Sequence, residues 1–184
     1  MSNLPSTPFW FLRHGETDWN ARGWSQGNVD VPLNAAGRAQ AAAAAQLLVG
    51  RGIASIVASP LSRAHDTAIV AGQALGLPVE IEQELREVSF GVQEAQPMAG
   101  AWFDEWVTGT ATPEGAEAFV DLRARAVRAI ARALSRPAPV LVVAHGALFR
   151  ALRAEMGLEP NVRTPNGTPF WCVPGQPWTL EPPI

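Results

Sequence analysis

Hydrophobic positions gather into short runs separated by segments rich in glycine and proline. Residues 8–12 are apolar and aromatic, and the run is too short for a helix, so it predicts a buried strand. Runs at 55–58, 79–81 and 140–143 predict three more strands, of which 140–143 is the most strongly β-branched. Residues 168–173 and 178–180 flank a turn at Gly175 and Gln176, which predicts a short hairpin at a sheet edge.

Segments between these strands carry helical signals. Residues 34–48 begin at Asn34, a good capping residue, and continue through an alanine-rich stretch to stops at Gly50 and Gly52. Residues 60–75 predict a helix that ends at Gly76, and residues 147–156 predict another. Residues 117–134 have apolar positions near a 3.6-residue period. Residues 15–32 predict a loop, and residues 85–96 predict a loop or a broken helix.

A strand followed by a helix, repeated along the chain, predicts parallel pairing. We therefore expect an α/β fold: a three-layer α/β/α sandwich whose central sheet is mostly parallel, with an antiparallel edge strand. The 184 residues are enough for one substantial core and few for two, so the expected organisation is a single domain over residues 1–184.

Composition narrows the function classes. Hydrophobic residues make up 47% and charged residues 17%, which is typical of a globular chain. With 14 basic and 17 acidic residues the net charge is -3, so no basic field is available to attract nucleic acid. The single cysteine, Cys172, excludes an internal disulfide and is expected to be a packing residue. Without an apolar run of ~20 residues or a signal-like start, we expect no membrane contact and a cytoplasmic location.

Five polar residues fall where strands end or helices begin. Arg13 and His14 end the first strand, Arg63 opens a helix, Glu87 lies in a loop, and His145 ends the strand at 140–143. Ligands of open α/β sheets bind outside the carboxyl ends of the strands. Each residue alone has an ordinary surface or structural explanation. Together, two arginines and two histidines on one rim are typical of a cradle for a phosphate dianion.

The string LRHGETDWN, residues 12–20, resembles the signature of the histidine phosphatase superfamily in its phosphoglycerate mutase-like branch, branch 1. Four further segments resemble family motifs in the correct order. They are GNVDVPLNAAGRAQA at 27–41, SPLSRAHDTA at 59–68, LREVSFG at 85–91 and VLVVAHGALFRAL at 140–152. A lone RHG is a weak signal, whereas five ordered segments make chance an unsatisfactory explanation.

The resemblance implies an enzyme, a phosphomonoesterase that hydrolyses small phosphate esters through a phosphohistidine. His14 would be the nucleophile, neutral for attack, and Glu87 the general acid, with Phe90 as an apolar neighbour that favours its protonated form. Arg13, Arg63 and a protonated His145 would hold the phosphoryl oxygens. The further candidates for substrate binding are Asn20, Thr17, Gln26 and Gly27. The expected partner is a small-molecule phosphate ester, and neither a metal nor another cofactor is required.

Two alternatives stay open. One is a cofactor-dependent phosphoglycerate mutase, which needs extra basic and tyrosine residues for a second anionic group. Residues 96–114 contain no Arg or Lys and the chain contains no Tyr, so the phosphatase is favoured. The other is a phosphate-binding module without catalysis, which the presence of all five chemical residues disfavours.

The natural substrate, the tautomer of His14 and the oligomeric state, including a homodimer, are left open by the sequence. Relatives often have a basic residue where this chain has Trp24, which bears on substrate choice. Trp102, Phe103 and Trp106 have helical spacing, with Trp102 and Trp106 on one face, and core packing is the favoured interpretation. A second hypothesis is that these aromatic residues roof the site. A supporting role for Glu117 is equally open.

Overall fold

The computed structural model describes residues 4–183, and it contains one six-stranded sheet in the order β3-β2-β4-β1-β5-β6. The strands are β1 Phe9–Arg13, β2 Ser55–Ala58, β3 Val79–Ile81, β4 Val140–Ala144, β5 Pro169–Val173 and β6 Thr179–Glu181. Strands β1 to β4 pair in parallel, with Leu12 of β1 opposite Val143 of β4. Strand β5 pairs antiparallel with β1, and β6 with β5. The predicted mostly parallel sheet and edge hairpin are confirmed.

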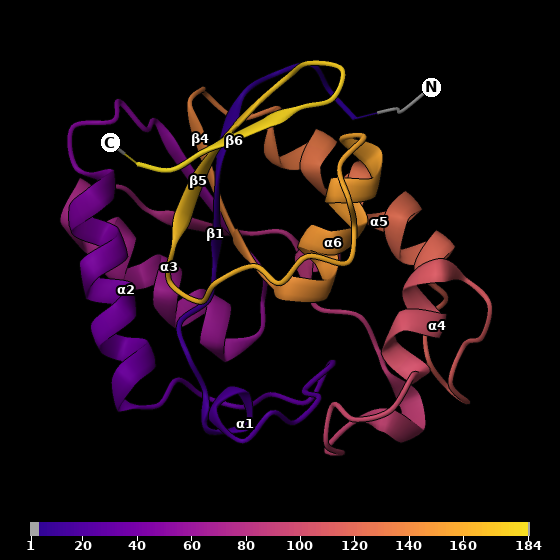
Figure 1. Ribbon diagram of the computed structural model, residues 1–184. Helices are drawn as coiled ribbons and strands as arrows, with labels where there is room; N and C mark the ends of the chain where they lie inside the picture. Colours follow the sequence, from indigo (N-terminus) through magenta and orange to yellow (C-terminus); the bar gives the residue numbers. More distant parts are fainter. Residues whose placement is uncertain (1–3, 184) are drawn as a thin grey trace.

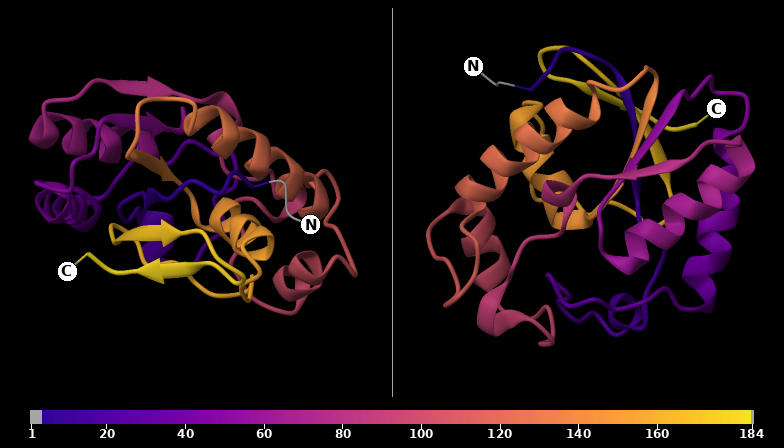
Figure 2. Two further views of the ribbon diagram at one scale, coloured as in Figure 1. Left: turned by 90° about the horizontal axis from the view of Figure 1, so that it is seen from above. Right: turned by 180° about the vertical axis from the view of Figure 1, so that it is seen from behind.

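Helices cover both faces of this sheet, which gives the predicted three layers (Figures 1 and 2). They are α1 Asp18–Ala21, α2 Ala35–Leu48, α3 Ser62–Leu75, α4 Trp102–Thr108, α5 Phe119–Ala133 and α6 Gly146–Glu155. In the segment expected to be a loop or broken helix, residues 85–96, one 3₁₀ turn, Gln83–Leu85, ends at its first residue and a second, Gly91–Gln93, lies inside it. The short helix α1 lies inside the predicted loop 15–32, where four residues carry too weak a pattern to predict it.

Local signals set the helix ends. The side chain of Asn34 accepts a hydrogen bond from the amide of Gly37 at 2.8 Å, so it caps α2 as predicted. Helix α3 ends at Leu75, and the next residue, Gly76, stops it with a left-handed φ of +67°. Helix α3 begins at Ser62, two residues later than expected, because residue 61 still has extended backbone.

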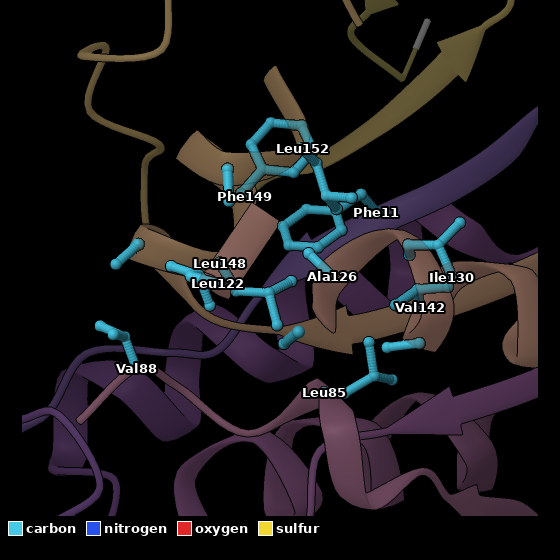
Figure 3. Packing of buried hydrophobic residues seen from close by; sticks show 14 of the residues in the cluster. Phe11, Leu85, Val88, Leu122, Ala126, Ile130, Val142, Leu148, Phe149 and Leu152 are labelled. Carbon is cyan, nitrogen blue, oxygen red and sulfur yellow. The ribbon is translucent and has the colours of Figure 1, made fainter. Parts of the chain in front are cut away.

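Two apolar clusters lie on opposite faces of the sheet. On one face, Phe11 and Val142 pack against Leu122 of α5 and Phe149 of α6 (Figure 3). The other face packs against small residues of α2 and α3, such as Ala44 and Ala68, which allow close approach. Cys172 is buried in the first cluster, which agrees with its predicted packing role.

The parallel pairing brings the carboxyl ends of β1, β2 and β4 to one edge of the sheet. The loop that carries α1 follows β1 at this edge (Figure 1). The residues singled out in the sequence therefore meet at one rim. Within residues 4–183, none of the helices has the length and apolar character that crossing a membrane demands.

Replacing Phe11 by alanine should destabilise the protein by about 3–5 kcal/mol, because it leaves a cavity in the core. Phe11 is fully buried and stacks on Phe149 with ring centroids 4.0 Å apart. Urea denaturation followed by far-UV circular dichroism measures the change. The control is Val120→Ala on α5, whose residue is 66% exposed. Similar losses in both variants would show that the core described above does not stabilise the fold.

Candidate active site

A cavity of about 270 Å³ opens at the carboxyl ends of the strands. Its walls come from β1, the loop 23–27, the start of α3, the loop around Glu87, the start of α6 and residues 163–164. Among the predicted site residues, those that line it are Arg13, His14, Asn20, Gln26, Gly27, Arg63 and Glu87. His145 is directly followed by lining residues Gly146 and Ala147, and its imidazole ring lies 5.2 Å from that of His14, centroid to centroid.

Neighbouring elements fix the backbone around His14. The amide of His14 donates to the carbonyl of Ala144 on β4 at 3.0 Å, and the amide of Gly15 donates to the hydroxyl of Thr67 at 3.1 Å. A side chain at residue 15 would overlap the carbonyl of Gly37, so glycine is required at this close approach to α2. These contacts fix the backbone on both sides of His14, whose imidazole lines the cavity.

One hydrogen bond determines the tautomer of His14. Its Nδ1 lies 2.7 Å from the carbonyl oxygen of Gly15. A carbonyl can only accept, so Nδ1 carries the hydrogen and Nε2 keeps its lone pair. Burial lowers the pKa of His14 well below 6.5, and the charges of Arg63 and Arg13 lower it further. The imidazole is therefore neutral at physiological pH, as a nucleophile requires.

The two arginines are held by backbone carbonyls. Arg63 donates from Nη1 to Val29 at 2.8 Å and from Nη2 to Gly27 at 2.8 Å. Arg13 donates from Nη1 to the carbonyl of Thr164 at 2.5 Å. Burial lowers the pKa of each to about 10, so both stay charged. In each the buried Nε has no hydrogen-bond partner among the described residues, which leaves a donor for an anion.

His145 sits at the N-terminal end of α6 and is fully buried. Its Nε2 lies 2.6 Å from the hydroxyl of Ser59, and its buried Nδ1 has no partner in the described part of the chain. Burial, with the charge of Arg63 next, lowers its pKa well below 6.5. Without a bound anion the ring is therefore neutral, because two guanidinium groups share the site, and protonation in the presence of phosphate stays a prediction. A phosphate dianion would act in the opposite direction.

Glu87 is held at the start of α6 by backbone amides. Its Oε1 accepts from Val88 at 3.1 Å and Leu148 at 2.9 Å, and its Oε2 accepts from Ala147 at 2.9 Å. A carboxyl group offers about four lone-pair positions, two on each oxygen. The three amides occupy both positions on Oε1 and one on Oε2, so the remaining position is on Oε2. Phe90, the expected apolar neighbour, lines the same cavity, but amide groups surround the carboxyl oxygens.

The remaining predicted residues divide into lining and supporting ones. Asn20, Gln26 and Gly27 line the cavity, whereas Thr17 is fully buried behind it. The hydroxyl of Thr17 donates to Gln26 Oε1 at 2.8 Å, and it also accepts from the amide of Asn20 at 3.1 Å. The structure thus places Thr17 as a support for Asn20 and Gln26.

Sequence reasoning missed several supporting residues. Asn166 donates from Nδ2 to the carbonyl of His14 at 2.9 Å and to Asn20 Oδ1 at 3.3 Å. The hydroxyl of Thr67 donates to the carbonyl of Arg63 at 2.7 Å, which links Arg63 to the Gly15 loop. No local pattern marks such residues, since only the fold makes them neighbours.

Glu117 has the supporting role that the sequence left open. It pairs with Arg125 through both oxygens, at 2.8 and 2.6 Å. Arg125 also donates from Nη1 to the carbonyls of Glu84 and Arg86, at 2.6 and 2.8 Å. This ion pair fixes the chain directly before Glu87. In the sequence, the only sign of this role is that an acidic and a basic residue lie eight positions apart, at the entry to α5 and within it.

The outer cavity wall is partly aromatic. Trp24, Phe90, Met98 and Phe103 line it. Trp106 is fully buried and donates from Nε1 to the carbonyl of Glu117 at 2.8 Å. The core interpretation is therefore confirmed for Trp106.

Trp102 packs edge-on against Phe90 and Phe103 and does not line the cavity. The hypothesis that the aromatic residues of this helix roof the site is wrong for Trp102 and Trp106, whereas Phe103 does line the cavity.

The side chains of the site are not a set of metal ligands. Residues 4–183 bring together no group of three or more His, Cys, Asp or Glu side chains suited to a metal ion. The donors that meet here are guanidinium, imidazole and amide groups, which suit an anion.

Comparison with known proteins gives a consistent family. The sequence model of the histidine phosphatase superfamily (branch 1) matches residues 9–164. A glucosyl-3-phosphoglycerate phosphatase of Mycobacterium tuberculosis (strain CDC 1551 / Oshkosh) is 38% identical over 173 residues, which cover 84% of this chain and 77% of that protein. A Yersinia enterocolitica protein named "Probable phosphoglycerate mutase GpmB" is 38% identical over 162 residues, 82% of this chain and 75% of that protein.

Comparison with solved structures also finds proteins of this kind. A mycobacterial glucosyl-3-phosphoglycerate phosphatase in complex with VO3 superposes with a TM-score of 0.84 and 31% identity. The match covers 94% of this chain and 96% of that chain.

The lowered pKa of His14 predicts a pH-dependent stability. The unfolded chain protonates this residue below its ordinary pKa of 6.5, whereas the folded chain does not, so stability falls as the pH falls. Between pH 7.5 and 5.5 the contribution of one such histidine is about 1.4 kcal/mol. Urea denaturation at both pH values should show a smaller fall for His14→Gln than for the parent. Equal falls would contradict the lowered pKa.

Proposed function

Because this chain belongs to the histidine phosphatase superfamily, branch 1, we propose that it hydrolyses phosphate monoesters in two steps through a phosphohistidine on His14. It is a phosphomonoesterase, an enzyme of the same kind as its mycobacterial relatives. The observation that carries the proposed mechanism is the hydrogen bond from His14 Nδ1 to Gly15, because it leaves Nε2 free to attack.

In the first step, the Nε2 lone pair of His14 attacks phosphorus and the bond from phosphorus to the ester oxygen breaks. Arg13 and Arg63 hold the phosphoryl oxygens, and their unpartnered Nε donors support this role. His145 offers its Nδ1 to a phosphoryl oxygen, which requires a hydrogen on that atom. Two fixed positive charges offset a dianion in a site of low dielectric.

The leaving oxygen takes its proton from Glu87. We assign this proton to Oε2, since amide donors leave only that oxygen with a lone pair for it. In the second step a water attacks phosphorus, the phosphorus–nitrogen bond breaks, and the carboxylate of Glu87 takes the proton of the water. Inorganic phosphate leaves, and His14 and Glu87 return to their starting states.

Substrate binding is proposed for Asn20, Gln26 and Gly27. All three line the cavity, and the network through Thr17 and Asn166 holds the first two. The names of the mycobacterial relatives support a small organic phosphate ester as the substrate.

The mutase alternative is not favoured. Helix α4 occupies the segment that would supply extra cations, and residues 96–114 have no Arg or Lys. A non-catalytic module is likewise disfavoured, since the nucleophile, the acid and both arginines meet in one cavity. Turnover of 3-phosphoglycerate that depends on a bisphosphate primer would reverse the choice of phosphatase over mutase.

Three further properties are proposed. Metal independence is supported by the anion-binding character of the donor set. A cytoplasmic location is supported by the single cysteine, Cys172. A single domain over residues 1–184 is supported by the one sheet that all six described strands share. A homodimer stays open.

Replacing His14 by alanine should abolish hydrolysis, with a loss of at least ~10⁴-fold in kcat, because the covalent route is removed. Activity on 4-nitrophenyl phosphate with EDTA present measures the change, and acid-labile phosphate on the quenched enzyme identifies the intermediate. His65→Ala on α3 is the matched control, since its residue is half-exposed outside the cavity. Parent-like activity of the alanine variant would overturn the mechanism.

Glu87→Gln should slow phosphoryl transfer from an alkyl phosphate by about 10²–10⁴-fold and from 4-nitrophenyl phosphate far less, because nitrophenolate leaves without a proton. Single-turnover rates with glycerol 3-phosphate and 4-nitrophenyl phosphate separate this step from the later hydrolysis. The control is Glu105→Gln, an exposed residue of α4. Equal losses on both esters would remove Glu87 from the role of acid.

A further inference from the structure

Two arginines that the proposed mechanism does not use also line the cavity. Arg150 lies on α6 one turn after Gly146, and Arg163 precedes Thr164, whose carbonyl binds Arg13. Neither residue was singled out by its position in the sequence. Both reach the cavity only because α6 and the chain after it fold back beside β1.

Neither arginine forms an ion pair with a carboxylate of the described residues, although Glu87 attracts Arg150 from a distance. None of the ion pairs found within residues 4–183 includes Arg150 or Arg163. Asp104 attracts Arg150, but its Oδ1 already accepts from Asn161 at 2.7 Å. Arg150 has a buried Nε without a partner in the described chain, and its guanidinium lies over the ring of Phe103 at 4.6 Å.

The two arginines repel each other and repel Arg13. The pKa of Arg150 is lowered by burial, and the charge of Arg163 contributes to the lowering. Three like charges around one cavity are unfavourable without an anion, and the phosphoryl group accounts for only one part of the site. The structure thus retains positive charge beyond what the phosphoryl group requires.

Position separates these arginines from the phosphoryl cradle. The charges that lower the pKa of His14 are those of Arg63 and Arg13. The guanidinium of Arg150 instead lies over Phe103 of the outer cavity wall, and the side chain of Arg163 is exposed at the rim. Arg150 and Arg163 therefore lie on the side of the cavity where the leaving group of the ester would extend, next to Phe103.

We propose that Arg150 and Arg163 form a subsite that binds a carboxylate on the leaving group of the phosphate ester. A planar guanidinium matches the two oxygens of a carboxylate, and the partial burial of Arg150 strengthens such a contact. The apolar wall of Trp24, Met98 and Phe103 packs against the carbon skeleton between the two anionic groups. The proposal rests on the phosphatase function and assigns a specificity to its leaving-group side.

A matched pair of substrates tests the subsite. 3-Phosphoglycerate and glycerol 3-phosphate are of similar size and differ mainly in carrying a carboxylate or a hydroxymethyl group. The parent enzyme should show a kcat/KM for 3-phosphoglycerate at least about tenfold above that for glycerol 3-phosphate, as one charge-assisted contact provides. In Arg150→Gln and in Arg163→Gln this ratio should fall about tenfold, mainly through KM for 3-phosphoglycerate.

The control is Arg128→Gln, which removes the same charge from the exposed face of α5 and should leave the ratio unchanged. Equal kcat/KM for the two esters in the parent, or an unchanged ratio in both cavity variants, would overturn the subsite while leaving the phosphatase intact. If the cavity variants lost kcat/KM equally on both esters, the arginines would act at the phosphoryl group, and the proposed subsite would again be overturned. If the enzyme hydrolysed none of the three compounds, 3-phosphoglycerate, glycerol 3-phosphate and 4-nitrophenyl phosphate, that result would instead contradict the proposed function.

Discussion

The hydrogen bond from Nδ1 of His14 to the carbonyl of Gly15 is the interaction on which the site depends. It fixes the ring, selects the tautomer and leaves the lone pair of Nε2 free for the attack that we propose. The carbonyl can hold this position because the backbones of Gly15 and Gly37 touch, and because Thr67 binds the amide of Gly15. A nucleophile at the end of a buried strand is thereby positioned by backbone contacts, which are less adjustable than side-chain contacts.

Charge and burial act together around this imidazole. Two guanidinium groups and a low-dielectric surrounding keep His14 uncharged, and the same groups supply the charge that a phosphoryl dianion needs. Backbone carbonyls hold Arg13 and Arg63 in place. A carbonyl carries no net charge, so it does not cancel the charge of a guanidinium as a carboxylate would. A protein with a net charge of -3 can therefore bind an anion through a local arrangement.

The fold and the chemical centre were largely predictable from sequence. Strands such as residues 140–143 and caps such as Asn34 are strong local signals, and the ordered motifs place His14, Arg63 and Glu87 on one rim. The lowered pKa of His145 in the site without an anion could not be predicted, because sequence does not reveal how many guanidinium groups surround a ring. Asn166, Arg150 and Arg163 could not be found, since each approaches the site only through the path of α6 and the hairpin behind it.

The most direct test of the account is the protonation state of the His14 ring in solution. Long-range ¹H–¹⁵N spectra of the ¹⁵N-labelled enzyme, assigned with His14→Gln, report which ring nitrogen carries hydrogen. The account predicts a neutral ring with hydrogen on Nδ1 and a bare Nε2 at pH 7, unchanged on lowering the pH to 6. A ring protonated on both nitrogens at pH 7, or one with its hydrogen on Nε2, would contradict it.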